Sequence, residues 1–167
     1  MINPLKPYWK NIKWFIIGGT ADDDEANEVV REWPGTRCFG VEPNAHFHFK
    51  QVEKFPGVVV HRALWDTDGD LLQLTALPGR EKSGSVCAPD CRPDFTGCDW
   101  QEYNERLRSQ TVSSATLDML SEKHGPFDDC CLWLDVEYAE LRALQGAQKV
   151  LEGMGVMMRK EQSVAME

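Results

Sequence analysis

The chain has 167 residues, a hydrophobic content of 42% and six tryptophans, which argues against disorder and suits one domain with a sizeable core. Its formal net charge of −9, with no basic run to offset it, disfavours a nucleic-acid partner. No segment approaches the roughly 18 apolar residues of a membrane span, and the N-terminus lacks the apolar part of a secretory signal. We therefore expect a cytoplasmic protein without a membrane partner, whose six cysteines are thiols.

The N-terminal part predicts a lead-in followed by one β–α unit. Residues 1–13 carry two prolines and three lysines and predict an irregular lead-in to a single domain over residues 14–167. Residues 14–17 are apolar and β-prone and run into Gly18-Gly19-Thr20, which is typical of a strand and its turn. Thr20 or Asp22 is the expected N-cap of the next helix. The inner face of that helix is expected to consist of Ala26, Val29, Val30 and Trp33.

Two further strand-forming segments follow the same pattern. Residues 38–42 predict a second strand ending on Glu42, and Pro43 suits the first position of a second helix. The inner face of this helix is expected to consist of Ala45, Phe49 and Val52. Residues 58–64 predict a third strand, and residues 71–77 predict another after a polar turn. Repeated β–α units imply right-handed crossovers and a parallel sheet.

The hydrophobic period is lost over residues 78–99, which predicts a loop insertion that is mobile and close to a ligand crevice. The loop holds three unevenly spaced cysteines, namely Cys87, Cys91 and Cys98. A zinc site needs four ligands, often in Cys-x2-Cys pairs, so we expect thiols or one disulfide and no metal. Asp99 is the expected cap of a helix that continues to Leu107.

The last third of the chain predicts two helices and two strands. Ser113 or Ser114 is the expected cap of a short helix that Gly125 follows. The almost wholly apolar residues 130–136 predict a strand buried on both faces, and residues 155–159 predict a final strand. A helix to Glu152 is expected between them, with an inner face of Leu141, Leu144, Gln148 and Leu151 and with Ala147 and Val150 beside it.

These elements predict an α/β fold in which a mostly parallel sheet of order 3-2-1-4-5 carries helices on both faces. The ligand crevice of such a sheet lies at the carboxyl ends of the strands, here between strands 1 and 4. Asp135 and Glu137 fall at that place and, on an extended strand, share one side. They are the candidate catalytic residues, as a general base or to orient an acceptor hydroxyl. The alternative is helix capping and dipole stabilisation.

A glycine turn followed by an acid is a second candidate feature. The turn lets a ligand approach the backbone. In dinucleotide-binding folds, an acid about 20 residues after the glycine turn binds the ribose hydroxyls. Glu42 lies 24 residues after Gly18 and can have the same role. The alternative is an ordinary turn with a surface Glu. The next helix begins with the acidic run Asp22 to Glu25, which repels a pyrophosphate and disfavours a dinucleotide-dependent oxidoreductase. S-adenosylmethionine, which has a sulfonium and no phosphate, suits these charges better.

Several short blocks occur in a recognisable order, and the last is the most specific. They are Glu42-Pro43-Asn44, Arg62-Ala63-Leu64-Trp65 with Asp68-Gly69, Thr116-Leu117-Asp118, and Leu134-Asp135-Val136-Glu137-Tyr138-Ala139-Glu140-Leu141 with Gln145-Gly146-Ala147. In this order and spacing the chain resembles the FkbM-type methyltransferases over roughly residues 14 to 161. The resemblance implies a class I S-adenosylmethionine-dependent fold and O-methylation of a sugar or related hydroxyl.

The resemblance also implies roles for single residues. Gly18 and Gly19 would lie against the cofactor, Glu42 would hold its ribose, and Ala63 and Leu64 would lie near its adenine. Asp135 would lie near the methyl-transfer centre.

The sequence also departs from the family pattern. Ile16 stands where the family has Asp, and Tyr138 stands where it has Gly. The chain ends after the predicted fifth strand, without the antiparallel pair that usually completes the sheet. The alternative function is therefore a non-catalytic, methyltransferase-like binding module.

Overall fold

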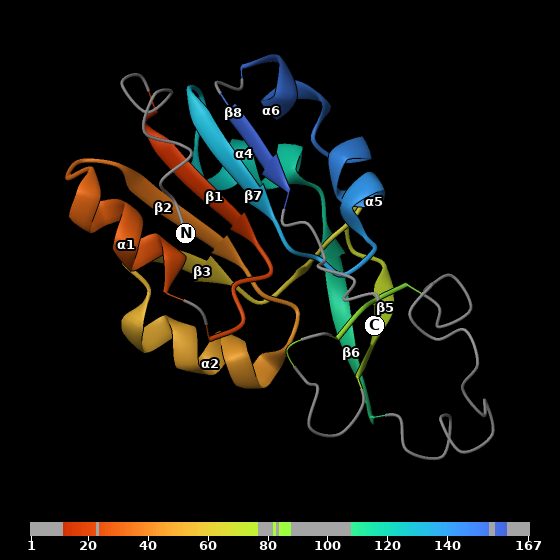
Figure 1. Ribbon diagram of the computed structural model, residues 1–167. Coiled ribbons are helices and arrows are strands. Elements are labelled where there is room, and N and C mark those ends of the chain that lie inside the picture. Colours follow the sequence, from red (N-terminus) through yellow and green to blue (C-terminus); the bar gives the residue numbers. More distant parts are fainter. Residues whose placement is uncertain are drawn as a thin grey trace, which may run out of the picture.

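The computed structural model describes residues 12–22, 24–76, 82, 84–87, 108–153 and 156–159. Its main sheet has five strands in the order β3-β2-β1-β7-β8, and every neighbouring pair is parallel (Figure 1). The strands are β1 (Trp14–Gly18), β2 (Arg37–Val41), β3 (Gly57–Val60), β7 (Cys130–Leu134) and β8 (Val156–Arg159). The predicted α/β class and strand order 3-2-1-4-5 are confirmed.

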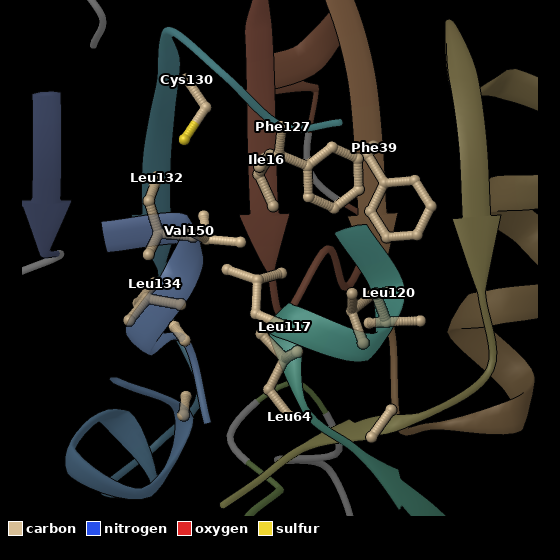
Figure 2. Packing of buried hydrophobic residues seen from close by; sticks show 14 residues of the cluster. Ile16, Phe39, Leu64, Leu117, Leu120, Phe127, Cys130, Leu132, Leu134 and Val150 are labelled. Atoms are coloured by element: carbon tan, nitrogen blue, oxygen red, sulfur yellow. The ribbon is translucent and has the colours of Figure 1, made fainter. Parts of the chain in front are cut away.

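Helices cover both faces of this sheet. The side chains of β1 alternate between the two faces, so this strand contributes to two hydrophobic cores. Phe15 and Ile17 face α1 (Glu25–Glu32), from which Ala26 and Val29 are buried. Ile16 faces the other side, where α4 (Leu117–His124), α5 (Glu140–Gln145) and α6 (Gln148–Glu152) pack. Figure 2 shows this second core, built from Ile16, Phe39, Leu117, Leu120, Phe127, Cys130, Leu132, Leu134 and Val150.

A second, three-stranded sheet lies beyond the carboxyl ends of the parallel strands (Figure 1). It consists of β4 (Ala63–Leu64), β6 (Arg108–Ala115) and β5 (Leu71–Ala76), with β5 and β6 antiparallel. The predicted strand 58–64 is therefore two strands in two sheets. The predicted caps Ser113 and Ser114 lie within β6, and the cap of α4 is Thr116, whose side chain accepts from the amide of Met119.

The predicted inner face of α2 (Ala45–Lys54) is wrong. Phe49 and Val52 are 71% and 59% exposed, Ala45 is also exposed, and the buried residues are Phe47 and Gln51. The helix begins after Asn44, whose side chain accepts from the amide of His46, so Pro43 lies outside it. The helix is turned so that Gln51 lies on its inner face, where the side-chain amide donates hydrogen bonds.

Two other helix predictions need correction at their ends. The N-cap position of α1 is Asp24, not Thr20 or Asp22, and no side chain caps the helix. The predicted helix to Glu152 is divided into α5 and α6 at Gly146, where a Cβ would lie 2.1 Å from the carbonyl oxygen of Trp65. This close approach explains why the helix is interrupted at Gly146. Leu141, predicted on the inner face, is 69% exposed, and Ala147 is buried.

Parts of the predictions fall outside the described residues. These parts are residues 1–11 of the lead-in, the helix predicted over 99–107, and the loop 78–99 apart from Lys82 and residues 84–87. Among the residues that are described, no helix is long and apolar enough to cross a membrane.

Candidate functional site

A pocket with about 570 Å³ of free space, open mouth included, lies at the carboxyl ends of β1, β2 and β7. This is the expected place for a ligand in an open α/β sheet. Its described lining consists of Gly19, Ala21, Val41, Glu42, Pro43, Asn44, Ala63, Leu64, Leu74, Lys82, Gly84, Val86, Asp135, Val136 and Ala139.

The two glycines after β1 allow close packing at the base of this pocket. Gly19 has a φ of +81°, and a Cβ there would lie 2.0 Å from the carbonyl oxygen of Asp135. A Cβ on Gly18 would lie 2.7 Å from the Leu64 side chain and 2.9 Å from that of Leu134. Gly19 therefore lines the pocket, whereas Gly18 packs behind it and lets the β1 and β7 ends come together.

Glu42 is buried, with 3% of its surface exposed, although the sequence allowed a surface Glu as the alternative. Its Oε2 accepts hydrogen bonds from the backbone amide of Ala21 at 2.7 Å and the hydroxyl of Thr20 at 3.3 Å. Its Oε1 accepts from the backbone amide of Asn44 at 2.8 Å. Burial raises the pKa of this carboxyl, and the three donors act in the opposite direction. Glu42 thus ties the turn after β1 to the end of β2.

Helix α2 fixes the same turn from the other side. The buried amide of Gln51 donates to the carbonyl oxygens of Thr20 and Ala21 at 3.2 and 3.1 Å. The ammonium of Lys54 donates to the carbonyl oxygen of Asp22 at 2.6 Å. The three carbonyl groups around Ala21, which has a φ of +43°, are therefore satisfied by side chains.

The segment after β7 is a turn and not an extended strand. The strand ends at Leu134, and Glu137 and Tyr138 have φ angles of +48° and +71°. Asp135 and Glu137 therefore do not alternate as strand residues would. Asp135 is half-buried and lines the pocket, whereas Glu137 is not among the described lining residues. The backbone amide of Asp135 donates to the carbonyl oxygen of Gly18 at 2.9 Å, which keeps this acid next to the glycine turn.

Residues 84–87 hold the turn after β7 in place. The backbones of Ser85 and Thr75 exchange two hydrogen bonds, and the buried hydroxyl of Ser85 donates to the carbonyl oxygen of Glu137 at 2.5 Å. The same hydroxyl accepts from the amide of Cys87 at 3.1 Å. The thiol of Cys87 donates to the carbonyl oxygen of Tyr138 at 3.3 Å. Ser85 and Cys87 thus dock this segment onto the turn.

An apolar wall completes the pocket opposite the polar groups. Ala63 and Leu64 of β4 are buried and line it, and Leu74 and Val86 extend this wall. Lys82 lies at the lining and forms an ion pair with Asp22, and this contact lowers the pKa of Asp22.

A family model, the methyltransferase FkbM domain, matches residues 19–162 of the chain. The chain belongs to the FkbM methyltransferase family. Curated proteins and solved structures gave no match. Tyr138, which stands where the resemblance implies Gly, has a φ of +71°, in the region that favours glycine.

The structure thus brings together five of the seven residues predicted for the FkbM site: Gly19, Glu42, Ala63, Leu64 and Asp135. Gly18 and Glu137 lie beside the pocket, and the roles of all seven stay predictions. Sequence spacing does not predict Gln51 and Ser85, which position the two turns through hydrogen bonds. The helical spacing of Gln51 four residues after Phe47 is the signal that could have placed it on the inner face.

Among the described residues there is no group of three or more His, Cys, Asp or Glu side chains that could hold a metal ion. Cys38, Cys130 and Cys131 are buried free thiols, and burial raises their pKa values to about 12, 11 and 12. Cys91 and Cys98 lie outside the described residues.

Proposed function

We propose that this FkbM family member transfers a methyl group from S-adenosylmethionine to a hydroxyl of a small molecule or glycan. Neither a nucleic acid nor a membrane is part of this proposal. The observation that carries it is the buried Glu42 carboxylate, which faces the same pocket as Asp135. One acid is suited to hold the cofactor, and the other is suited to act on the acceptor.

The residues of the pocket fit the cofactor. Glu42 lines the pocket, and a carboxylate oxygen can accept a hydrogen bond from a ribose hydroxyl. The apolar wall at Leu64, Leu74 and Val86 suits an adenine ring.

The charges around the first helix support a cofactor without phosphates. The acids Asp24, Glu25 and Glu28 lie at and inside the start of α1 and oppose a phosphate at this helix terminus. Asp22 is already paired with Lys82.

Asp135 has the position and chemistry to handle the acceptor. When bound, S-adenosylmethionine supplies an electrophilic methyl group on a sulfonium. A carboxylate oxygen of Asp135 can accept a hydrogen bond from the acceptor hydroxyl, aim its oxygen, and take its proton as the new bond forms. The hydrogen bond from the amide of Asp135 to Gly18 keeps the acid at the base of the pocket.

Calorimetry with S-adenosylmethionine and, separately, with NAD tests the cofactor assignment. We expect S-adenosylmethionine alone to bind, and Glu42→Ala to weaken it by about 1–3 kcal/mol through loss of a charge-assisted hydrogen bond. Glu53→Ala, on the exposed face of α2, is the matched control and should bind normally. Equal affinity of the folded Glu42→Ala variant and the wild type would remove Glu42 from the cofactor site.

Turnover separates the enzyme from a non-catalytic binding module. We expect a screen of glycans and small alcohols, followed by release of S-adenosylhomocysteine, to give an active acceptor. On that acceptor Asp135→Asn should keep cofactor affinity and lose about 100-fold in turnover, because it keeps the shape but removes the base. Unchanged turnover would exclude Asp135 as the base. Cofactor binding without turnover on any acceptor would favour the binding module.

A further inference from the structure

A second cavity lies between the end of β3 and helix α4, and it shares no described lining residue with the first pocket. It has about 530 Å³ of free space, open mouth included. Its described lining comes from two segments and consists of Val60, His61, Arg62, Met119, Leu120, Lys123 and His124.

Every ionisable group in this described lining is basic, although the chain carries a net charge of −9. Arg62 and Lys123 are far apart in the sequence, so no run of basic residues indicates that they share a cavity. Within the described part of the chain neither has a carboxylate partner, and the guanidinium of Arg62 donates to the carbonyl oxygen of His61 at 2.8 Å. Other cations of the chain, such as Lys149 and Arg142, are paired with acids.

Helix stabilisation accounts for only half of this cluster. Lys123 and His124 lie in the last turn of α4, where positive charge is favourable. Arg62 and His61 belong to the loop after β3, where no such reason applies. Two segments therefore bring positive charge to one cavity, and this charge would stabilise a bound anion.

The ring of His61 is held in place on the lining of this cavity. Its Nε2 atom lies 2.9 Å from the carbonyl oxygen of Pro43 and 3.2 Å from the side-chain nitrogen of Gln110. Beside the cations, Val60, Met119 and Leu120 give the cavity an apolar side.

We propose that this cavity binds the phosphate group of a small phosphomonoester, with Arg62 and Lys123 as its charged ligands and the apolar side against its organic part. Two full positive charges match the charge of a phosphate monoester better than that of a carboxylate, and the guanidinium fork matches phosphate oxygens. The proposal does not depend on methyl transfer, and it holds whether or not the first pocket binds S-adenosylmethionine.

Nuclear magnetic resonance titration at constant ionic strength tests this site with three probes: inorganic phosphate, phenyl phosphate and phenol. We expect saturable shifts for the rings of His61 and His124 and for the amides of Arg62 and Lys123, but not for the ring of His46. Phenyl phosphate should bind more tightly than inorganic phosphate, and phenol should cause no shift. The absence of saturable shifts, or equal affinity for the two phosphates, would overturn the proposal.

Charge-neutral variants complete the test. Arg62→Gln and Lys123→Gln should each weaken phenyl phosphate binding by about threefold to tenfold, the size expected for a partly solvated charge-assisted contact. Both side chains are exposed, so the fold should persist. Arg31→Gln, which removes an exposed cation from the last turn of α1, is the matched control and should bind normally. Equal weakening in all three variants would reveal general attraction to anions and overturn the site.

Discussion

The two sides of the pocket at the carboxyl ends of β1, β2 and β7 are built in different ways. On one side, the turn after β1 and the end of β2 are joined through buried groups, because Glu42 accepts three hydrogen bonds and Gln51 donates two. On the other side, the turn after β7 is half-buried, contains two consecutive non-glycine residues with positive φ, and is held by Ser85. The proposed cofactor side is thus fixed by burial, and the proposed acceptor side by local contacts that can be removed singly.

The largest effect is expected where the two sides meet. Gly19→Ala places a Cβ 2.0 Å from the carbonyl oxygen of Asp135, at a φ of +81°. We expect the free energy of unfolding to fall by about 3 kcal/mol or more, because a backbone clash adds to an unfavourable φ. Chemical denaturation measures this loss.

Gly69→Ala is the matched control for that substitution. Gly69 has nearly the same φ, +82°, but its Cβ would have no heavy atom within 4 Å. We expect a loss of about 1 kcal/mol, the cost of the backbone conformation alone. Equal losses in the two variants would show that the contact between Gly19 and Asp135 does not hold the two sides together.

The buried carboxyl of Glu42 predicts a pH dependence. Burial raises its pKa in the folded protein above the ordinary value near 4.5, so the folded state holds this proton more tightly than the unfolded chain. The contribution of Glu42 to stability is therefore fully present below pH 4.5 and is lost as the pH rises through the raised pKa.

Glu42→Gln isolates this contribution. Both oxygens of Glu42 accept hydrogen bonds, and the hydroxyl oxygen of the protonated acid can still accept, whereas the NH2 group of Gln cannot. The variant should therefore be less stable than wild type by about 1–3 kcal/mol at low pH. This difference should shrink as the pH rises, and urea unfolding of both proteins across that range measures it. A difference that grows with pH would mean that the three donors outweigh burial and that the pKa is lowered.

A loss smaller than that of Gly19→Ala is expected on the proposed acceptor side. Ser85→Ala removes the hydroxyl that bonds the carbonyl oxygen of Glu137 and the amide of Cys87. Because Ser85 is only 1% exposed, both groups lose their partner inside the protein, and we expect a loss of about 1–3 kcal/mol. Thermal unfolding measures it. Ser109→Ala, at an exposed position of β6, should stay within about 0.5 kcal/mol of wild type. Similar values for the two variants would show that Ser85 does not secure the turn.

The sequence predicts the parallel sheet because strands buried on both faces read as continuous apolar runs, as in residues 130–134. It misses β6 because this strand belongs to an antiparallel pair and is rich in Ser and Thr, which read as helix caps. Hydrophobicity also places Phe49 on the wrong side of α2, because the inside position of Gln51 is set by its hydrogen bonds to the glycine turn.

The candidate site was likewise predictable from the sequence only in part. The carboxyl ends of β1, β2 and β7 bring Gly19, Glu42 and Asp135 to one pocket, as strand order and spacing predict. The turn after β7 could not be predicted from alternation, because its positive φ angles belong to residues that seldom adopt them. The cation cluster of the second cavity is likewise invisible in the sequence, since it forms only when the β3 end and α4 meet.

The smallest expected effect concerns the backbone of Tyr138. At its φ of +71°, a residue with a Cβ is strained relative to glycine. Tyr138→Gly and Tyr138→Ala both remove the aromatic ring, so their difference reports the backbone. We expect the Gly variant to be the more stable by about 1 kcal/mol in denaturant unfolding.

The opposite order is expected inside a regular helix, and this provides the control. At the exposed position Glu53 of α2, the Gly variant should be the less stable by about 1 kcal/mol, because glycine there loses more backbone freedom on folding. The reversal of sign between positions 53 and 138 would locate the strain in the turn after β7. The same order at both positions would mean that Tyr138 is not held in a left-handed conformation in solution, and that the side of the pocket bearing Asp135 relaxes once the ring is removed.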